Sequence, residues 1–374
     1  MAEREQTKER LNESEVDPKL YYDYEGRFIM QNLEKEHVML LPRVVKPPLF
    51  ARGGHALGDL RVFERYKIGP ISMITCSFLE LAPGERTERH RMLPSQIAYV
   101  LEGAGESVQD GVSHAFGPDD VVLVPPYTTS YWAAGPVGLR LWVPQVRLWH
   151  VLGMLWDEQQ EFQRTPEGTE PLHDAAGKLV GYRVPAGVLG LERPLEVRAE
   201  VNARRDTFFR ARRAVTTAPK PKTTYDWFTT RLVEENEIER TAPRVIREAD
   251  VALERTRQGM TRWYVTRWSR LAGQPLDLMT MEIEPGGHTG EHRHVFEELI
   301  YVQSGRGHDL HGDTEHPWEA GDLVCVPPMT AHQHHNDGEE AARLVSVWPK
   351  QLAHELLGGI EHLADASAWK ARGR

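Results

Sequence analysis

The sequence predicts an all-β fold built from two tandem copies of one domain. The first observation is an internal repeat, because residues 84–134 align with residues 286–336 without insertion or deletion. The second is a set of short apolar runs that end at proline, such as Leu323–Val326, which is typical of short buried strands. The third is a turn signal of Gly and Asp in the middle of each copy, at residues 110–111 and 312–313.

The repeat keeps the residues that shape turns and changes some of those that could carry chemistry. Its offset of 202 residues places four framing residues of the first copy on identical residues of the second: Gly84 on Gly286, His90 on His292, Gly103 on Gly305 and Pro125 on Pro327. A duplication of this kind predicts that both copies fold in the same way.

The repeat and the local composition divide the chain into four segments. We expect an N-terminal arm over residues 1–37, a first barrel over 38–162, a linker over 163–224 and a second barrel over 225–374. The arm is charged, and the linker is rich in Pro, Gly and Arg, as exposed loops often are. We expect short flanking helices, because apolar residues recur at helical intervals after the second copy: Leu352, Leu356, Ile360 and Leu363.

Composition excludes several classes of protein. The net charge of −10 and the pI near 6.0 argue against a nucleic-acid surface, because such surfaces are basic. The N-terminus lacks the apolar stretch of a secretory signal, and no run of about 18 apolar residues could span a membrane. The two cysteines, Cys76 and Cys325, lack metal or redox spacing, so we expect buried thiols. We therefore expect a cytoplasmic protein.

Three imidazoles and one carboxylate stand at fixed intervals in the second copy. The pattern reads His292-x-His294-x3-Glu298, and His332 follows beyond a turn. Alternate residues of a strand point to one face, so His292 and His294 share a face and Glu298 keeps their parity. Four such groups that converge on one point are what a transition metal requires, so the pattern indicates a metal site.

This stretch resembles both motifs of the cupin superfamily, position by position, over residues 286–305 and 321–336. The one departure is Met329, where that family usually has glycine. The resemblance implies a bicupin, that is, two tandem cupin barrels of the double-stranded β-helix or jelly-roll type. It also implies one metal ion, held by His292, His294, Glu298 and His332.

The first copy departs from this set of ligands. Only His90 is kept, while Met92, Gln96 and Ser130 replace the other three ligands. One imidazole with a thioether, an amide and a hydroxyl is a poor site for a divalent cation. We therefore predict a metal-free first barrel with a structural role, with oligomer contact or shaping of the other pocket as lesser options.

The two-barrel architecture and the stretch RHRMLPSQIAYVLEGAG, residues 89–105, resemble the gentisate 1,2-dioxygenase group, which includes salicylate dioxygenases. This resemblance implies a mononuclear non-haem Fe(II) dioxygenase that oxidises, and ring-cleaves, a small hydroxylated aromatic compound chelated to the metal. That group usually works from the first barrel with three histidines and no carboxylate. Here the complete set of ligands lies in the C-terminal barrel.

Two other functions stay open. One is a redox-neutral metal-dependent cupin enzyme, such as an isomerase, lyase or decarboxylase, and the other is a non-catalytic cupin that binds a small ligand. Imidazole and carboxylate ligands suit Fe(II), which we favour, and Mn, Ni, Cu or Zn are the alternatives, although Zn lacks the redox states for oxygen chemistry. The expected partners are a small-molecule substrate and O2, and we expect a homo-oligomer.

Residues beside the ligands are candidates for catalysis and substrate binding. His334 lies two residues beyond His332, so we expect it to face inward and act as the acid–base group. We expect His288, on the loop before the ligands, and Met281, on the strand before them, to contact substrate. We expect the other histidines of this copy to lie at the surface: His308, His311, His316 and His335.

Overall fold

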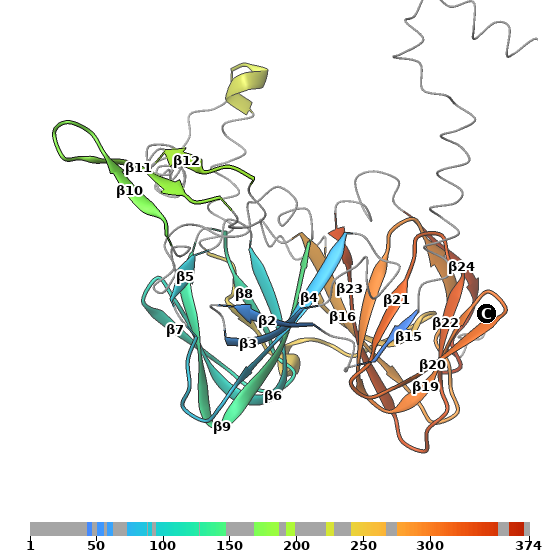
Figure 1. The fold of residues 1–374 in the computed structure, drawn as a ribbon. Helices are drawn as coiled ribbons and strands as arrows, with labels where there is room; N and C mark the ends of the chain where they lie inside the picture. The colour runs from blue at the N-terminus through green and yellow to red at the C-terminus, as the bar shows by residue number, and fades with distance from the viewer. Residues whose placement is uncertain are drawn as a thin grey trace, which may run out of the picture.

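The computed structural model describes residues 43–46, 51–55, 58–62, 73–87, 89–91, 95–126, 128–146, 168–186, 192–198, 222–227, 241–266, 275–350 and 359–369. Strands dominate these residues and form two barrels side by side, with a small sheet that projects from the first (Figure 1). The predicted all-β fold of two tandem jelly-roll barrels is confirmed. The predicted N-terminal arm lies outside the described residues.

The first barrel is formed by one nine-stranded antiparallel sheet in the order β13-β8-β6-β9-β4-β3-β2, with β5 on β9 and β7 on β6. Its strands are β2 (Ala51–His55), β3 (Gly58–Val62), β4 (Ile74–Leu81), β5 (His90–Arg91), β6 (Gln96–Gln109), β7 (Val112–Phe116), β8 (Val121–Val124), β9 (Thr129–Val146) and β13 (Val245–Ile246). A buried apolar cluster that includes Val100, Trp132 and Leu141 fills its interior.

The second barrel consists of two sheets that face each other. The seven-stranded sheet contains β1 (Val44–Val45), β21 (Leu323–Val326), β18 (Glu298–Ser304), β23 (Ala342–Pro349), β16 (Leu276–Ile283), β15 (Gly259–Val265) and β14 (Glu254–Thr256). The five-stranded sheet contains β20 (Thr314–Glu319), β19 (Arg306–His311), β22 (His332–Asn336), β17 (Glu291–His294) and β24 (Ile360–Ala364). Apolar side chains such as Met281, Phe296 and Val324 form its core.

A glycine allows close packing at the same corner of each barrel. Gly103 has φ +78°, and a Cβ there would lie 2.1 Å from the carbonyl oxygen of Gly138. Gly305 has φ +91°, and a Cβ there would lie 2.6 Å from the Cβ of Ala342. Both positions therefore require glycine, which explains why the repeat keeps this residue.

The two barrels exchange strands. β1 precedes the first barrel but pairs with β21 of the second, and β13 precedes the second barrel but pairs with β8 of the first. Symmetric backbone hydrogen bonds flank these pairs, because the Cys325 N–H donates to the Arg43 carbonyl and the Leu123 N–H donates to the Arg244 carbonyl. Each barrel is thus completed by a segment that lies before the other barrel in the chain.

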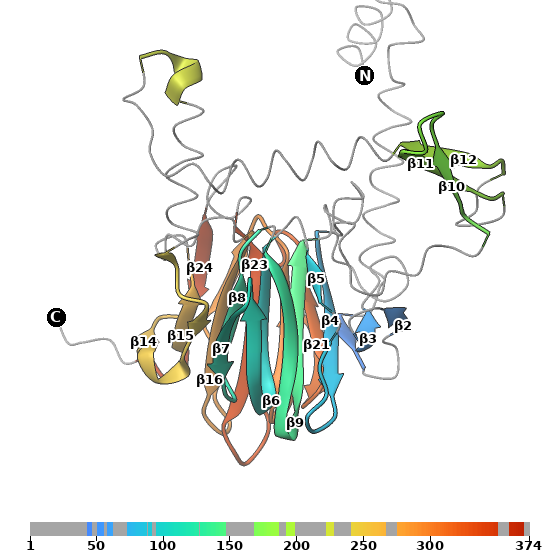
Figure 2. The same ribbon diagram turned by 90° about the vertical axis from the view of Figure 1, so that its left-hand side faces the viewer.

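A shared core joins the barrels. Strands of both barrels run along a common direction in Figure 2, and aromatic rings meet between them, with ring centroids 5.5 Å apart for Phe78 and Tyr301 and 6.1 Å apart for Tyr99 and Tyr264. Cys76 and Cys325 belong to this core as buried free cysteines, as predicted. Burial raises the pKa of the Cys76 thiol to about 12.

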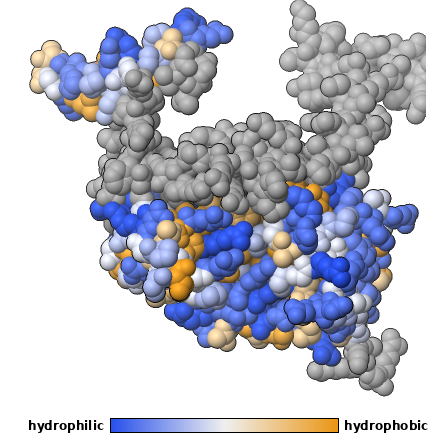
Figure 3. Space-filling model, turned by 60° about the horizontal axis from the view of Figure 1, so that its bottom comes forward, coloured by the Kyte–Doolittle hydropathy of each residue, from blue (hydrophilic) through white to orange (hydrophobic). Residues whose placement is uncertain are grey.

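The surface seen in Figure 3 is mainly hydrophilic, with apolar side chains in small patches. Apolar residues therefore gather in the three cores rather than on this face. Among the described residues, no helix is long and apolar enough to cross a membrane.

The segment after the second copy differs from the expected helical pattern. Ile360 and Leu363 lie in strand β24, which pairs with β17, so the prediction of a helix through these residues was wrong. Leu352 and Leu356 lie outside the described residues. Within the predicted linker, a three-stranded sheet forms from β10 (Glu170–His173), β11 (Leu179–Val184) and β12 (Leu195–Arg198).

Candidate metal centre

Two facing sheets bring the four predicted ligands together. His292 on β17 and His332 on β22 are direct partners in the five-stranded sheet, and His294 follows on the same face. Glu298 begins β18 on the opposing sheet. All four side chains are buried, and one possible ligand atom from each lies within 4.8 Å of the others. The residues thus form a site that could hold one metal ion.

Backbone carbonyls orient all three imidazoles. Each Nδ1 lies at hydrogen-bonding distance from a carbonyl oxygen two residues away: 3.0 Å from Gly290 for His292, 2.6 Å from Phe296 for His294 and 2.9 Å from Thr330 for His332. Because a carbonyl can only accept, each Nδ1 carries a proton, which leaves each Nε2 as the ring nitrogen available to a metal. This is the form of histidine that binds a metal through Nε2.

The lone pairs in the site require a cation or a proton between them. His294 Nε2 lies 3.0 Å from Glu298 Oε2, and His332 Nε2 lies 3.5 Å from the same oxygen. The Nε2 atom of His332 is buried and makes no hydrogen bond within the described part of the chain. An unpaired buried acceptor is costly, so this donor set fits a bound divalent metal.

Burial and mutual proximity set the protonation states. Burial, with the neighbouring His332, lowers the pKa of His292 to about 2. Burial opposes ionisation of Glu298, but the imidazoles of His294 and His332 outweigh it and hold the pKa of that carboxyl well below its usual range. The site therefore presents an ionised carboxylate at Glu298 and a neutral imidazole at His292, which are the protonation states that metal binding requires of these two residues.

Neighbouring side chains hold two of the ligands in place. The Ser346 hydroxyl donates to Glu298 Oε1. The Phe296 ring stacks on His294, with centroids 4.0 Å apart and planes 1° apart, and Trp348 packs beyond Phe296 at 6.0 Å. Met281 is buried in the same apolar cluster as Phe296 and Trp348. The site thus has an aromatic and apolar wall beside His294.

The loop between β21 and β22 carries the one departure from the family motif. Met329 has φ +60°, a left-handed conformation that favours glycine, and its side chain is 55% exposed. Its N–H donates to the carbonyl of His294 at 2.7 Å. The loop is therefore bonded to a ligand-bearing strand, and its conformation explains why glycine is usual at this position.

His334 faces inward as predicted. It is fully buried, and its ring lies 5.4 Å from that of His332. Its Nδ1 lies 2.8 Å from an oxygen of Asp309, and its Nε2 is buried and makes no hydrogen bond to the described residues. Burial lowers the pKa of His334, but the Asp309 carboxylate outweighs it and raises that pKa.

Two histidines do not lie where the sequence predicted them. His311 is buried beside Asp309, so its expected surface position was wrong. His288 bonds Gln333 and packs against His335, with ring centroids 5.3 Å apart. Because Gln333 and His335 alternate with the inward residues of β22, the structure places His288 on the opposite face from the ligands.

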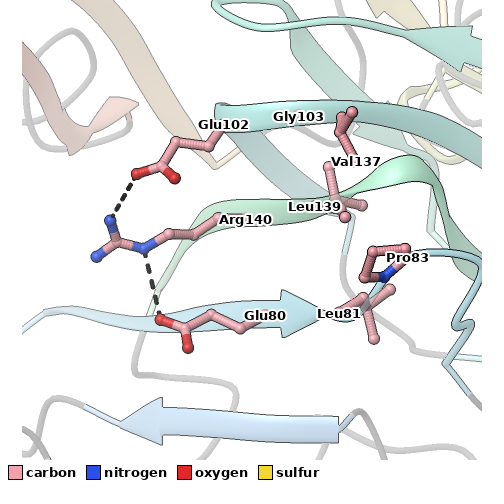
Figure 4. Close-up of a pocket in the computed structure, with 9 residues that line it drawn as sticks. Glu80, Leu81, Pro83, Glu102, Gly103, Val137, Leu139 and Arg140 are labelled. Atoms are coloured by element: carbon pink, nitrogen blue, oxygen red, sulfur yellow. Dashed lines mark hydrogen bonds and ion pairs between the residues drawn. The ribbon is translucent and has the colours of Figure 1, made fainter.

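The first barrel assembles different chemistry at the matching positions. His90 pairs with Ser130 across β5 and β9, and the Nε2 atoms of Gln96 and His90 lie 3.4 Å apart. Met92 lies outside the described residues. A surface pocket of this barrel lies elsewhere, at the Gly103 corner, where Arg140 sits between Glu80 and Glu102 (Figure 4). That pocket is lined neither by the four metal ligands of the second barrel nor by the residues at the matching positions of the first.

Comparison with known proteins agrees with this architecture. A family model for the cupin domain matches residues 77–137 and 279–348, one match in each barrel. Protein SchB of Streptomyces halstedii is 32% identical over 104 residues, which are 27% of this chain and 74% of that protein. The chain belongs to the cupin family and is a bicupin with a four-residue metal site in its second barrel.

Solved structures of oxalate decarboxylase from Bacillus subtilis share the fold. One variant aligns with a TM-score of 0.54 at 13% identity over 83% of this chain and 78% of that chain. Another variant aligns with a TM-score of 0.52 at 13% identity over 87% of this chain and 80% of that chain. A third structure of this enzyme, whose description names Mn(II) centres, aligns with a TM-score of 0.52 at 13% identity over 87% of this chain and 80% of that chain.

Proposed function

We propose that this bicupin is a metal-dependent enzyme that acts on a small chelating substrate in a redox-neutral reaction, as a decarboxylase, lyase or isomerase. The observation that carries the proposal is the buried site of three histidines and one glutamate with a buried histidine, His334, beside it. The shared fold with oxalate decarboxylases supports a redox-neutral reaction in preference to the dioxygenase suggested by the sequence motif.

The proposed roles follow from the geometry. His292, His294, Glu298 and His332 hold the metal, and Mn(II) or Fe(II) suits this donor set. A divalent metal supplies Lewis-acid chemistry by polarising a bound carboxylate, carbonyl or hydroxyl group. His334 exchanges a proton with the substrate through Nε2, because its Nδ1 is committed to Asp309. The apolar wall of Met281 and Phe296 excludes water.

A second function, the Fe(II) dioxygenase, is favoured by one observation. The wall beside His294 is aromatic, with Phe296 stacked on the ligand ring and Trp263 packed edge-on to Trp348 at 5.7 Å. A flat hydroxylated aromatic substrate would pack against such a wall. This function needs O2 as a second substrate, whereas the redox-neutral function does not.

Turnover with and without O2 distinguishes the two functions. Protein loaded separately with Mn(II) and Fe(II) is supplied with small dicarboxylates and hydroxy acids, and with gentisate, catechols and salicylates. We expect turnover in the absence of O2, measured as CO2 release or as product by mass spectrometry. O2 uptake that depends on substrate, with no anaerobic product, would replace the first function by the second. Binding without product in both atmospheres would contradict both.

A further inference from the structure

A second buried polar cluster lies on the inner face of the five-stranded sheet, next to the metal ligands. At its centre is Asp309 on β19, which is fully buried. Its Oδ1 lies 2.8 Å from His334 Nδ1 and accepts a hydrogen bond from Trp318 Nε1 at 2.9 Å. Its Oδ2 lies 3.3 Å from Nε2 of the buried His311. Three donors from three strands therefore converge on one carboxylate.

The repeat within the chain shows that a barrel of this kind can form without the cluster. In the first barrel, all four matching positions carry other residues: Ser107 for Asp309, Gln109 for His311, Phe116 for Trp318 and Trp132 for His334. There Phe116 and Trp132 pack edge to face, with ring centroids 6.0 Å apart, in the barrel interior. The polar cluster thus occurs in the barrel that has all four ligands and is replaced in the barrel that does not.

Burial of this cluster is costly. The hydrogen bonds that a buried carboxylate accepts must offset its loss of hydration. Apolar residues of similar volume often stabilise a core equally well. The first barrel uses that apolar arrangement at two of the four positions. A role in the chemistry of the second barrel accounts for a carboxylate at position 309, where a purely structural role does not require one.

The hydrogen bond to Asp309 determines which nitrogen of His334 is available. A carboxylate oxygen accepts, so Nδ1 of His334 carries a proton, and Nε2 lies on the opposite side of the ring. That Nε2 is buried and makes no hydrogen bond to the described residues, while the ring itself packs beside His332. An unsatisfied buried acceptor at this place is suited to a polar group of a bound substrate.

We propose that Asp309 is a positioning residue of the metal centre. Its carboxylate holds His334 in the Nδ1-protonated form and directs Nε2 toward substrate bound beside His332, and Trp318 and His311 hold the carboxylate in place. The role of substrate in this inference rests on the proposed function, whereas the orientation of His334 does not.

The first test is the tautomer of His334 in metal-free protein, measured by nitrogen-15 NMR of the imidazole ring. At alkaline pH, where the imidazole of His334 is neutral, we expect the wild type to show a protonated Nδ1 and an unprotonated Nε2. Asp309→Asn keeps an oxygen acceptor and should keep this pattern, whereas Asp309→Ser, the residue of the first barrel, should lose it. Asp309→Ser with Trp318→Phe reproduces two residues of the first barrel and serves as a second variant if the single one folds poorly. An unchanged tautomer in the serine variants would overturn the proposal.

The second test separates positioning from metal binding. In metal-loaded Asp309→Ser we expect kcat to fall about 10- to 100-fold, with KM and metal content close to wild type and activity largely rescued in Asp309→Asn. Adding Asp309→Ser to His334→Gln should cost nothing further, because both act through one group. Multiplicative losses, or metal loss in proportion to activity, would show that Asp309 acts elsewhere. A protein without turnover but with the expected tautomers would refute the proposed function alone.

Discussion

Individual side chains in the second barrel are set for metal binding by contacts to the backbone. The carbonyls of Gly290, Phe296 and Thr330 each fix one imidazole with its Nε2 free for a metal. Glu298 adds the one negative charge of the set and stays ionised because its imidazole neighbours outweigh its burial. The carboxylate should therefore contribute strongly to affinity for a divalent cation.

Adjacent glutamates allow a matched test of this charge. Glu298→Gln, which introduces the residue that the first barrel has at the matching position, should weaken metal binding at least about 10-fold, because the amide supplies no negative charge. Glu297→Gln is the control, since Glu297 is equally buried but accepts from the N–H of Ile74 at 2.7 Å. Titration calorimetry with Mn(II) measures both. Equal affinities in the two variants would exclude Glu298 as a ligand.

Protonation of His292 should make the metal-free protein sensitive to acid. The folded pKa of His292, about 2, lies below the unfolded value, so the folded protein binds fewer protons than the unfolded chain. This contribution is present above about pH 6.5 and is lost as pH falls below that value. Between pH 7.5 and 5.5 we expect a loss of about 1.4 kcal/mol from this residue. Urea unfolding of the wild type and of His292→Asn measures it, and equal pH dependence in both would contradict the assignment.

At the scale of elements, short loops join the strands that carry the ligands, and one of them is under backbone strain. Met329 adopts a left-handed conformation between β21 and β22, in a loop bonded to His294. The left-handed conformation is sterically unfavourable for most L-residues, and the exposed side chain of Met329 makes few packing contacts that could offset the strain. The strain therefore lies directly beside the metal centre.

Removal of this strain should stabilise the protein. We expect Met329→Gly to raise the free energy of unfolding by about 0.5 to 1 kcal/mol, because glycine adopts the left-handed conformation without steric cost. Met329→Ala keeps the Cβ atom and should give no such gain. Guanidinium unfolding of the three proteins checks this. A glycine variant no more stable than the alanine variant would show that the loop is not strained.

The sequence revealed some elements and not others. The four ligands could be found because their spacing encodes strand parity, and the strands around them because the repeat marks their turns. The buried positions of Asp309 and His311 were not predicted, because a single polar residue in a strand is usually assigned to the surface. The sequence did contain one indication of this cluster. The two copies differ at a position that should face the barrel interior, where Ser107 of the first copy matches Asp309 of the second. The extent of β24 was missed because Ile360 and Leu363 also fit a helical period.

At the scale of the whole molecule, the barrels depend on each other. The strand exchange of β1 and β13 could not be read from the order of segments along the chain, because both strands pair with the more distant barrel. Ion pairs accompany the exchange in the same symmetric way, Lys46 with Asp322 and Arg247 with Asp120. The oligomeric state and the partners of the protein remain predictions from its sequence.

A charge in the exchanged strand should destabilise the barrel that receives it. Val45 is fully buried in the shared core, so Val45→Asp places an unpaired carboxylate there, and we expect a loss of about 3 kcal/mol or more. Metal affinity of the second barrel should fall with it, although Val45 lies far from that barrel in sequence. Val112→Asp, at a position 58% exposed, is the control. Wild-type melting temperature and metal affinity in Val45→Asp would disprove the exchange.

Metal content per chain tests the central claim most directly, that the second barrel alone binds one ion. Inductively coupled plasma mass spectrometry is applied to the wild type and to a triple variant, His294→Met with Glu298→Gln and His332→Ser, which gives the second barrel the residues of the first. We predict one metal ion per chain in the wild type and none in the folded triple variant. Two ions per wild-type chain, or one retained in the triple variant, would contradict the account.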